Sequence, residues 1–257
     1  MADIWSWNNA VDAAGTLISS SVGSAGDLLT SNLLDPRVGR IWRAGATSAS
    51  LSIQLPTTGQ ISLFGVFGHN YQSLGPVNLK LGTTAGAGDL WETTFDPTEA
   101  KQAVFVLRDG DGVLAPVPAS FATITVAGGD PLEIGRVWLG TADWASAYGH
   151  AVDGSGWGGQ DLSRKSRTSR SGAVLADRGA RLRSFTANYK TLTPEEYAGS
   201  LFEMDDQGTT RQMLFVQDPD VYDPNRFAIL GYLDDIPDTS WQYFMTAGRA
   251  ITITEAG

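Results

Sequence analysis

The chain has 257 residues, with 28 acidic and 18 basic side chains, two histidines and no cysteine, so its formal net charge at pH 7 is −10. Without cysteine, disulfides, thiolate nucleophiles and cysteine-ligated metal sites are excluded. The acidic balance disfavours a nucleic-acid-binding protein, because neutralising phosphates requires a basic surface. We expect neither a transmembrane helix nor a secretory signal, since no apolar run approaches the roughly 18 residues that a membrane span needs.

Residues 1–31 are rich in Gly, Ser and Ala and carry only scattered apolar positions. A segment of this composition buries little surface by itself. We therefore predict an N-terminal extended arm over residues 1–31, which lies either on its own domain or on a neighbouring subunit.

Residues 32–140 carry the period-two pattern of half-buried β-strands. Apolar and polar residues alternate at 51–55, 61–63, 77–81 and 121–126. The run from Ala103 to Leu107 has no polar interruption, which fits a strand covered on both faces. Short strands of this kind, separated by Gly and Pro, predict an antiparallel β-sandwich or jelly roll.

Residues 141–257 are predicted to form a second β-rich domain, with strands at 182–189, 212–216, 227–233, 241–246 and 250–254. One helix is expected near 194–207, because Thr193 and Glu196 can form a capping box around Pro194 and Gly208 supplies the stop. The expected fold class is therefore mainly β: two β-sandwich or jelly-roll-like domains, the second with one packed α-helix.

Residues suited to catalysis or metal binding are few. His69 ends a predicted strand, and His150 lies in a glycine-rich loop without a partner at a motif spacing. Asp218, Asp220 and Asp223 supply oxygen ligands for Ca²⁺, but the glycine and glutamate of an EF-hand loop are missing, and the two Asp-Pro pairs are typical of a long turn. No hydrolase, nucleotide-binding or metalloprotease motif occurs. We expect no enzyme and no cofactor, with a carboxylate pair for glycoside cleavage as the alternative; metal binding by the three aspartates stays open.

A basic segment between residues 160 and 183 holds seven of the 18 cationic side chains of this acidic chain. Segregated charge predicts contact with an opposite surface, and the preferred partner is an acidic patch on an identical subunit. A solvated loop and an anionic polymer are the alternatives, although the segment lacks aromatic residues for base stacking. The candidate subunit-contact residues are Arg164, Lys165, Arg167, Arg170, Arg178, Arg181 and Arg183.

Tryptophans near predicted loops are candidates for stacking on a sugar ring or for filling an interface. Trp91, Trp144 and Trp157 are of this kind, and Trp157 lies between glycines where a local core is least expected. The alternative is that each ring covers the open end of a sandwich.

Nine segments carry a resemblance to a known family. In the first half they are residues 32–37 (NLLDPR), 41–43 (IWR), 51–55 (LSIQL), 61–70 (ISLFGVFGHN), 121–126 (FATITV) and 134–140 (IGRVWLG). Together they resemble the discoidin-type jelly roll found in tail proteins of double-stranded DNA bacteriophages, over roughly residues 25–140. Residues 182–187 (LRSFTA), 214–220 (LFVQDPD) and 229–231 (ILG) resemble the β-rich partner domain of the same phage proteins.

The resemblance implies a virion structural protein of a tailed bacteriophage, in the tail or tail tip, assembled in the host cytoplasm. Its implied partners are copies of itself, other virion proteins and a host-surface glycan, with neither a membrane nor nucleic acid expected. Discoidin-type domains bind ligands through loops at one end, which here correspond to Asn70, Tyr71 and the segment around Trp91. The alternatives are a carbohydrate-binding host-receptor module and a capsid decoration protein.

Overall fold

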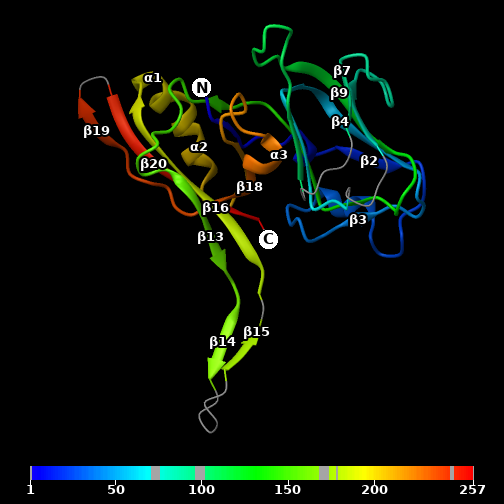
Figure 1. Cartoon of the computed structure of the whole chain (residues 1–257). Helices are drawn as coiled ribbons and strands as arrows, with labels where there is room; N and C mark the ends of the chain where they lie inside the picture. Colours follow the sequence, from blue (N-terminus) through cyan, green and yellow to red (C-terminus); the bar gives the residue numbers. More distant parts are fainter. Residues whose placement is uncertain are drawn as a thin grey trace.

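The computed structural model describes residues 2–70, 76–95, 102–167, 174–177, 179–243 and 246–256. Two units lie side by side, and a two-stranded ribbon projects from the second unit away from both (Figure 1). No described helix is long and apolar enough to cross a membrane.

The first unit is a β-sandwich of a five-stranded and a three-stranded antiparallel sheet. The five-stranded sheet contains, in order, β2 (Leu17–Ser20), β4 (Ala49–Ile61), β9 (Val117–Val126), β6 (Val77–Gly82) and β7 (Trp91–Phe95). The three-stranded sheet contains β11 (Arg136–Gly140), β5 (Leu63–Phe67) and β8 (Gln102–Val106). The remaining elements are β3 (Trp42–Arg43) paired with β10 (Glu133–Ile134), and the 3-10 helices η1 (Ala10–Asp12) and η2 (Thr30–Leu34). Eight strands in two packed sheets are the architecture of a jelly roll.

The second unit is built on an eight-stranded antiparallel sheet. Along the sheet lie β12 (Trp144–Ala145), β1 (Ile4–Ser6), β17 (Met213–Val216), β18 (Ala228–Leu233), β20 (Thr246–Glu255), β16 (Arg181–Leu192) and β13 (Gly156–Asp161), while β19 (Ser240–Tyr243) also pairs with β20. One continuous helix consists of α1 (Pro194–Glu196), a π-helical stretch η4 (Tyr197–Leu201) and α2 (Phe202–Gln207). A single turn, α3 (Pro224–Phe227), precedes β18, and the ribbon pairs β14 (Arg164–Arg167) with β15 (Val174–Asp177).

Three apolar clusters join these layers. The first fills the space between the two sheets of the sandwich, and the second lies between the eight-stranded sheet and the helix. The third joins the units, with Phe67 and Trp138 of the three-stranded sheet packed against Leu214 and Leu230 of the eight-stranded sheet. The three-stranded sheet is therefore covered on both faces.

Strand β5 shows how this packing suppresses the period-two signal. Its five residues are all buried. Phe64 and Val66 point into the sandwich core, whereas Leu63 and Phe67 belong to the cluster between the units. Because successive side chains of a strand point to opposite faces, two apolar faces give an unbroken apolar run. Ala103 and Val104 of β8 divide between the two clusters in the same way, as predicted for a strand covered on both faces.

The helix begins as the sequence predicted. The Thr193 hydroxyl accepts a hydrogen bond from Glu196 N, and the Glu196 carboxylate accepts one from Thr193 N, so the capping box is complete. Leu201 and Met204 are buried against the sheet, and Gly208 ends the helix with a positive φ of 69°. The mainly β class and the single packed helix are confirmed.

Residues 1–31 differ from the expected arm. Strand β1 lies inside the eight-stranded sheet between β12 and β17, and β2 forms the edge of the five-stranded sheet on β4. Trp5, Trp7 and Val11 are at most 1% exposed, so the first part of this segment is buried within its own chain, whereas residues 12–31 are exposed or half-buried except at Thr16. The change of sheet along the chain falls between β11, which ends at Gly140, and β12, which starts at Trp144.

Candidate functional site

The two-stranded ribbon is the feature of this fold that the packing of the two units does not explain. Strands β13 and β16 pair from Gly156 and Thr186 out to Asp161 and Arg181. Leu162 N continues the ladder by donating to Ala180 O, and β14 and β15 carry it further. Strand β16 pairs with β20 only as far out as Ser184. Beyond that point no third strand pairs with the ribbon within the described ranges, and Figure 1 shows it standing free of the body.

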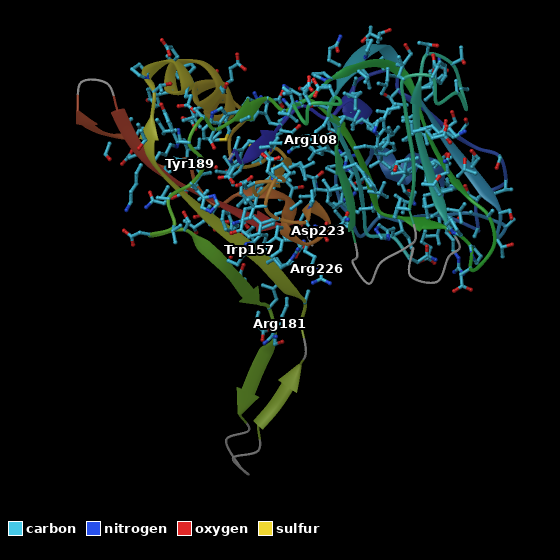
Figure 2. All side chains as sticks on the ribbon, turned by 45° about the horizontal axis from the view of Figure 1, so that its top comes forward. Arg108, Trp157, Arg181, Tyr189, Asp223 and Arg226 are labelled. Atoms are coloured by element: carbon cyan, nitrogen blue, oxygen red, sulfur yellow. The ribbon has the colours of Figure 1, made fainter. Side chains whose placement is uncertain are left out.

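The ribbon concentrates positive charge. Residues 160–183 carry seven basic and two acidic side chains, a net charge of +5, so the rest of the chain carries −15. Arg164, Lys165 and Arg167 form most of β14. Arg181 lies where the ribbon leaves the body (Figure 2), and its side chain is 86% exposed with Asp161 3.8 Å away. Of the other predicted contacts, Arg170 and Arg178 lie outside the described residues.

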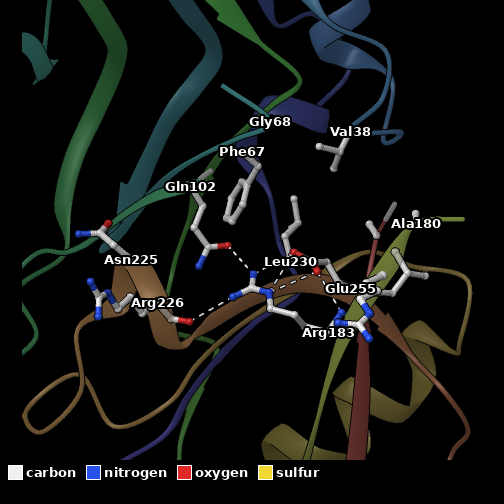
Figure 3. A pocket seen from close by; sticks show the side chains of 13 residues that line it. Val38, Phe67, Gly68, Gln102, Ala180, Arg183, Asn225, Arg226, Leu230 and Glu255 are labelled. Carbon is white, nitrogen blue, oxygen red and sulfur yellow. Dashed lines mark hydrogen bonds and ion pairs between the residues drawn. The ribbon is translucent and has the colours of Figure 1, made fainter. Parts of the chain in front are cut away.

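Arg183 anchors the root of the ribbon. Its Nε and Nη2 donate to Glu255 Oε1 at 3.2 and 2.9 Å, Nη1 donates to Arg226 O at 3.1 Å, and Nη2 also donates to Gln102 Oε1 at 2.9 Å. Gln102 comes from β8 of the first unit, and its Nε2 donates to Ala228 O of the second. The guanidinium therefore links the ribbon to β20 and α3 of the second unit and to the jelly roll (Figure 3).

A cavity of about 550 Å³ surrounds this guanidinium. Its apolar walls include Val38, Phe67 and Leu230. All three nitrogens of the Arg183 side chain already donate to oxygens of this chain. The Arg183 guanidinium is therefore used to hold the two units together, which is a structural role.

Trp157 is 36% exposed and belongs to none of the three apolar clusters, but it has aromatic neighbours that the local sequence does not predict. It lies on β13, with its ring centroid 5.0 Å from that of Phe185 and 5.7 Å from that of Phe227. Its Nε1 donates to Gln217 Oε1 at 2.8 Å, and the guanidinium carbon of Arg183 lies 6.0 Å from its ring centroid. The local sequence gives no sign of these contacts, because Phe185 comes from β16 and Phe227 from α3.

The other predicted glycan contacts are structurally engaged. Asn70 Nδ2 donates to Pro131 O, and its Oδ1 accepts from Glu133 N, both at 2.8 Å. Trp91 packs on Phe64 and Phe105, with ring centroids 6.0 and 5.9 Å apart. Tyr71 lies outside the described residues. Since Asn70 and Trp91 belong to the first unit and Trp157 to the second, these residues do not form one site.

Sequence reasoning missed a polar network in the second unit that reaches as far as Trp157. Asp3 is 0% exposed, and its Oδ2 lies 2.7 Å from His150 Nδ1 and accepts from the Tyr189 hydroxyl at 3.0 Å. Trp5 Nε1 donates to the same hydroxyl at 2.8 Å. Burial, with the Asp3 charge, raises the pKa of Tyr189. No local sequence motif indicates this network, because Asp3 and His150 are 147 positions apart in the sequence.

An Asp–His pair is the arrangement of a general base, but here the second imidazole nitrogen is also enclosed. His150 Nε2 lies 3.4 Å from Gln217 Nε2, and Gln217 in turn holds Trp157. The network thus ties the N-terminal strand to β16 and to the end of β17.

The three aspartates of the predicted turn diverge. Asp220 pairs with Arg108 of the first unit at 2.5 Å, and the Asp223 carboxylate caps α3 by accepting from Asn225 N. Burial raises the pKa of Asp218. Within the described part of the chain, no group of three acidic or histidine side chains is placed to hold a metal.

Comparison with known proteins concerns the fold. No protein-family model matches the sequence, and no curated protein matches it. The lectin domain of lectinolysin complexed with Lewis B antigen aligns over 51% of this chain and 95% of its own, at 14% identity and a TM-score of 0.41. The family 32 carbohydrate-binding module from C. perfringens NanJ in complex with galactose aligns over 54% and 99%, at 14% identity and a TM-score of 0.39. CpGH89CBM32-6 produced by Clostridium perfringens aligns over 51% of this chain and 98% of its own, at 14% identity and a TM-score of 0.39.

These alignments cover about half of this chain, and at 14% identity and TM-scores of 0.39 to 0.41 they carry no argument about its function. The β-sandwich of the first unit is established by its own strand pairing. None of the three structures is described as a virion protein, so the comparisons add nothing to the phage part of the resemblance.

Proposed function

We propose that this chain is a non-catalytic assembly subunit that binds another protein surface through its basic ribbon, and that the surface belongs to a second copy of the chain. The observation that carries the proposal is a two-stranded ribbon that stands free of the body. It lies within residues 160–183, whose net charge is +5 against −15 for the rest of the chain, and +4 remains when Arg183, which pairs with Glu255 of the body, is left out.

Two physical arguments support this reading. A two-stranded hairpin is at best marginally stable alone in water, so a long free ribbon gains stability from a partner. From Asp161 to Arg167 the free part extends about 20 Å at about 3.3 Å per residue. Opposite charges on the ribbon and the body steer copies toward each other, and this attraction weakens as salt is added.

Sedimentation velocity over a concentration series tests the proposal. We expect the 27.3-kDa chain to form oligomers at about 0.01 M salt and to dissociate at about 1 M, where the Debye length falls from about 30 to about 3 Å. A trimmed variant in which Asn-Gly replaces residues 163–179 keeps the register, because Leu162 and Ala180 are already paired and a two-residue turn can join them. This variant should sediment as a monomer in all conditions.

A second variant covers the case in which the trimmed chain does not fold. It keeps the backbone and removes charge through Arg164→Ser, Lys165→Ser and Arg167→Ser, and we expect it to associate more weakly than the unmodified chain. If the unmodified chain remains a monomer at low salt over the whole series, the proposal is wrong.

The finer proposal is that the assembly is a phage tail, as the sequence resemblance implies, with a capsid decoration protein as the related alternative. Electron microscopy of purified tailed-phage particles labelled with an antibody against this chain tests this, since label on the tail supports the first and label on the shell supports the second. Absence of label from all particles would rule out both.

Glycan binding by the first unit is the second candidate function. Jelly rolls serve both as viral structural domains and as lectins, so the architecture itself permits either use. A glycan array probed with the unmodified chain tests it, with Trp91→Ala as the variant of the first unit and Trp157→Ala as the matched variant outside it. Binding lost only in Trp91→Ala supports a site on the jelly roll, and absence of any binding removes the hypothesis.

A further inference from the structure

We infer that the ribbon of one copy docks on the outer face of the 194–207 helix of a second copy. This inference rests on the proposed function and names the surface that the ribbon recognises.

The outer face of the helix is uncovered. Positions 195, 198, 199, 202, 203 and 206 are exposed, and they recur with the spacing of a single helix face. Phe202 is 58% exposed on this face, although the opposite side of the same helix buries Leu201 and Met204. An aromatic side chain left in water on a short helix is suited to an interface.

The same face is acidic. Between Thr193 and Thr210 the sequence has five acidic residues and no basic one. Two of the five are used within the chain, since Glu196 completes the capping box and Asp205 pairs with Arg249. The other three are exposed and form no ion pair with any residue that the structure describes; they are Glu195, Glu203 and Asp206.

The ribbon matches this face in charge and in length. Its sequence places Arg164, Lys165 and Arg167 on β14, and Val174 and Leu175 on β15. A helix of 14 residues is about 20 Å long, comparable to the free part of the ribbon. By register, Lys165, Arg167 and Val174 share one face of the ribbon, whereas Arg164 and Leu175 are on the other. A helix docked on the first face therefore meets two basic positions and one apolar position, which can match the carboxylates around Phe202, and Arg164 adds attraction at longer range.

The contact must join two copies. In Figure 1 the ribbon extends from one end of the second unit and the helix covers the opposite end, so a ribbon cannot fold back onto its own helix. Docking one surface onto a different surface of the next copy is a head-to-tail contact, which closes into a ring or continues as a filament.

Charge reversal tests the inference. The helix variant carries Glu195→Lys, Glu203→Lys and Asp206→Lys. The ribbon variant carries Arg164→Glu, Lys165→Glu and Arg167→Glu. The matched control makes the same charge change on another exposed acidic segment, through Asp234→Lys, Asp235→Lys and Asp238→Lys.

We expect the helix and ribbon variants each to self-associate at least about 10-fold more weakly than the unmodified chain, because like charges then face each other. An equimolar mixture of the two should associate again, since each reversed surface finds an opposite one on the other variant. Phe202→Ala should weaken association without changing its salt dependence. The control triple should retain association.

The outcomes separate this inference from the proposed function. If trimming the ribbon abolishes association but the helix variant assembles like the unmodified chain, the helix face is not the partner while the ribbon still is. The same conclusion follows if the control triple abolishes association and the helix triple does not, or if mixing the reversed variants restores nothing. If the unmodified chain never associates, both ideas fail.

Discussion

His69 makes the stability of this protein sensitive to mild acid. It follows β5 at the end of the three-stranded sheet and is half-buried. Burial lowers the pKa of its imidazole from 6.5 to about 4, against a smaller opposing effect of a hydrogen bond with the Gln102 backbone. A histidine held neutral in the fold is destabilised when protonation becomes favourable in the unfolded chain.

The sign and size follow from proton linkage. Between pH 6.5 and pH 4 the unfolded chain binds a proton at His69 that the folded chain does not, so the free energy of unfolding decreases as pH falls through this window. With these two pKa values the loss between pH 7.5 and pH 4.5 is about 2.5 kcal/mol, since one pKa unit corresponds to about 1.4 kcal/mol.

Urea denaturation of the unmodified chain and of His69→Gln at both pH values isolates this contribution. Carboxylates also titrate in this range, but they do so in both proteins and cancel in the comparison. We expect the unmodified chain to lose about 2.5 kcal/mol more than His69→Gln on acidification. Equal losses in the two proteins would refute the reasoning, because His69 would then titrate alike in the folded and unfolded chains.

Two further substitutions test the packing. Asp3→Ala removes the buried acceptor shared by the half-buried imidazole of His150 and the buried phenol of Tyr189, so the free energy of unfolding in urea should fall by about 3–5 kcal/mol. Asp153→Ala, at an exposed pair, should change little, and equal losses in the two variants would contradict this account. Gly231→Ala places a Cβ 2.0 Å from Thr254 O between two central strands and should cost about 3 kcal/mol. In the control, Gly156→Ala, the added Cβ meets nothing within 4 Å, so the free energy of unfolding should change little. If Gly231→Ala were as stable as this control, the two strands would be able to move apart and the prediction would be wrong.

Local sequence patterns predicted the elements whose stabilising contacts lie within a few residues along the chain. The capping box at Thr193 and the glycine stop at Gly208 determine the helix ends through contacts within a few residues. Alternation identified β4, β6 and β9, and the unbroken apolar run identified β8 as a strand covered on both faces. The charge segregation of residues 160–183 was also visible at once, because charge needs no partner to be counted.

Short or glycine-rich strands were not predicted, because they show no periodic pattern of apolar residues. Strand β1 has three residues, which is too short to show alternation, so its residues were predicted as part of an arm. Strand β13 is rich in glycine and shows no apolar alternation, so no packing partner was predicted for Trp157. In the structure β1 is an interior strand and Trp157 packs on Phe185 and Phe227. Their neighbours come from distant parts of the chain, and a window of local sequence does not contain them.

The amino-acid sequence by itself determined the β-rich class, the jelly-roll pattern, the helix boundaries and the location of the positive charge. Only the tertiary structure decided that Asp3 meets His150, that Arg183 joins the two units, and that the basic segment stands out as a free ribbon. The physical reason is the distance along the chain over which each interaction acts. Propensity, capping and side-chain alternation act over a few residues, whereas strand order and buried polar partners are chosen by packing between segments that can lie more than 100 residues apart.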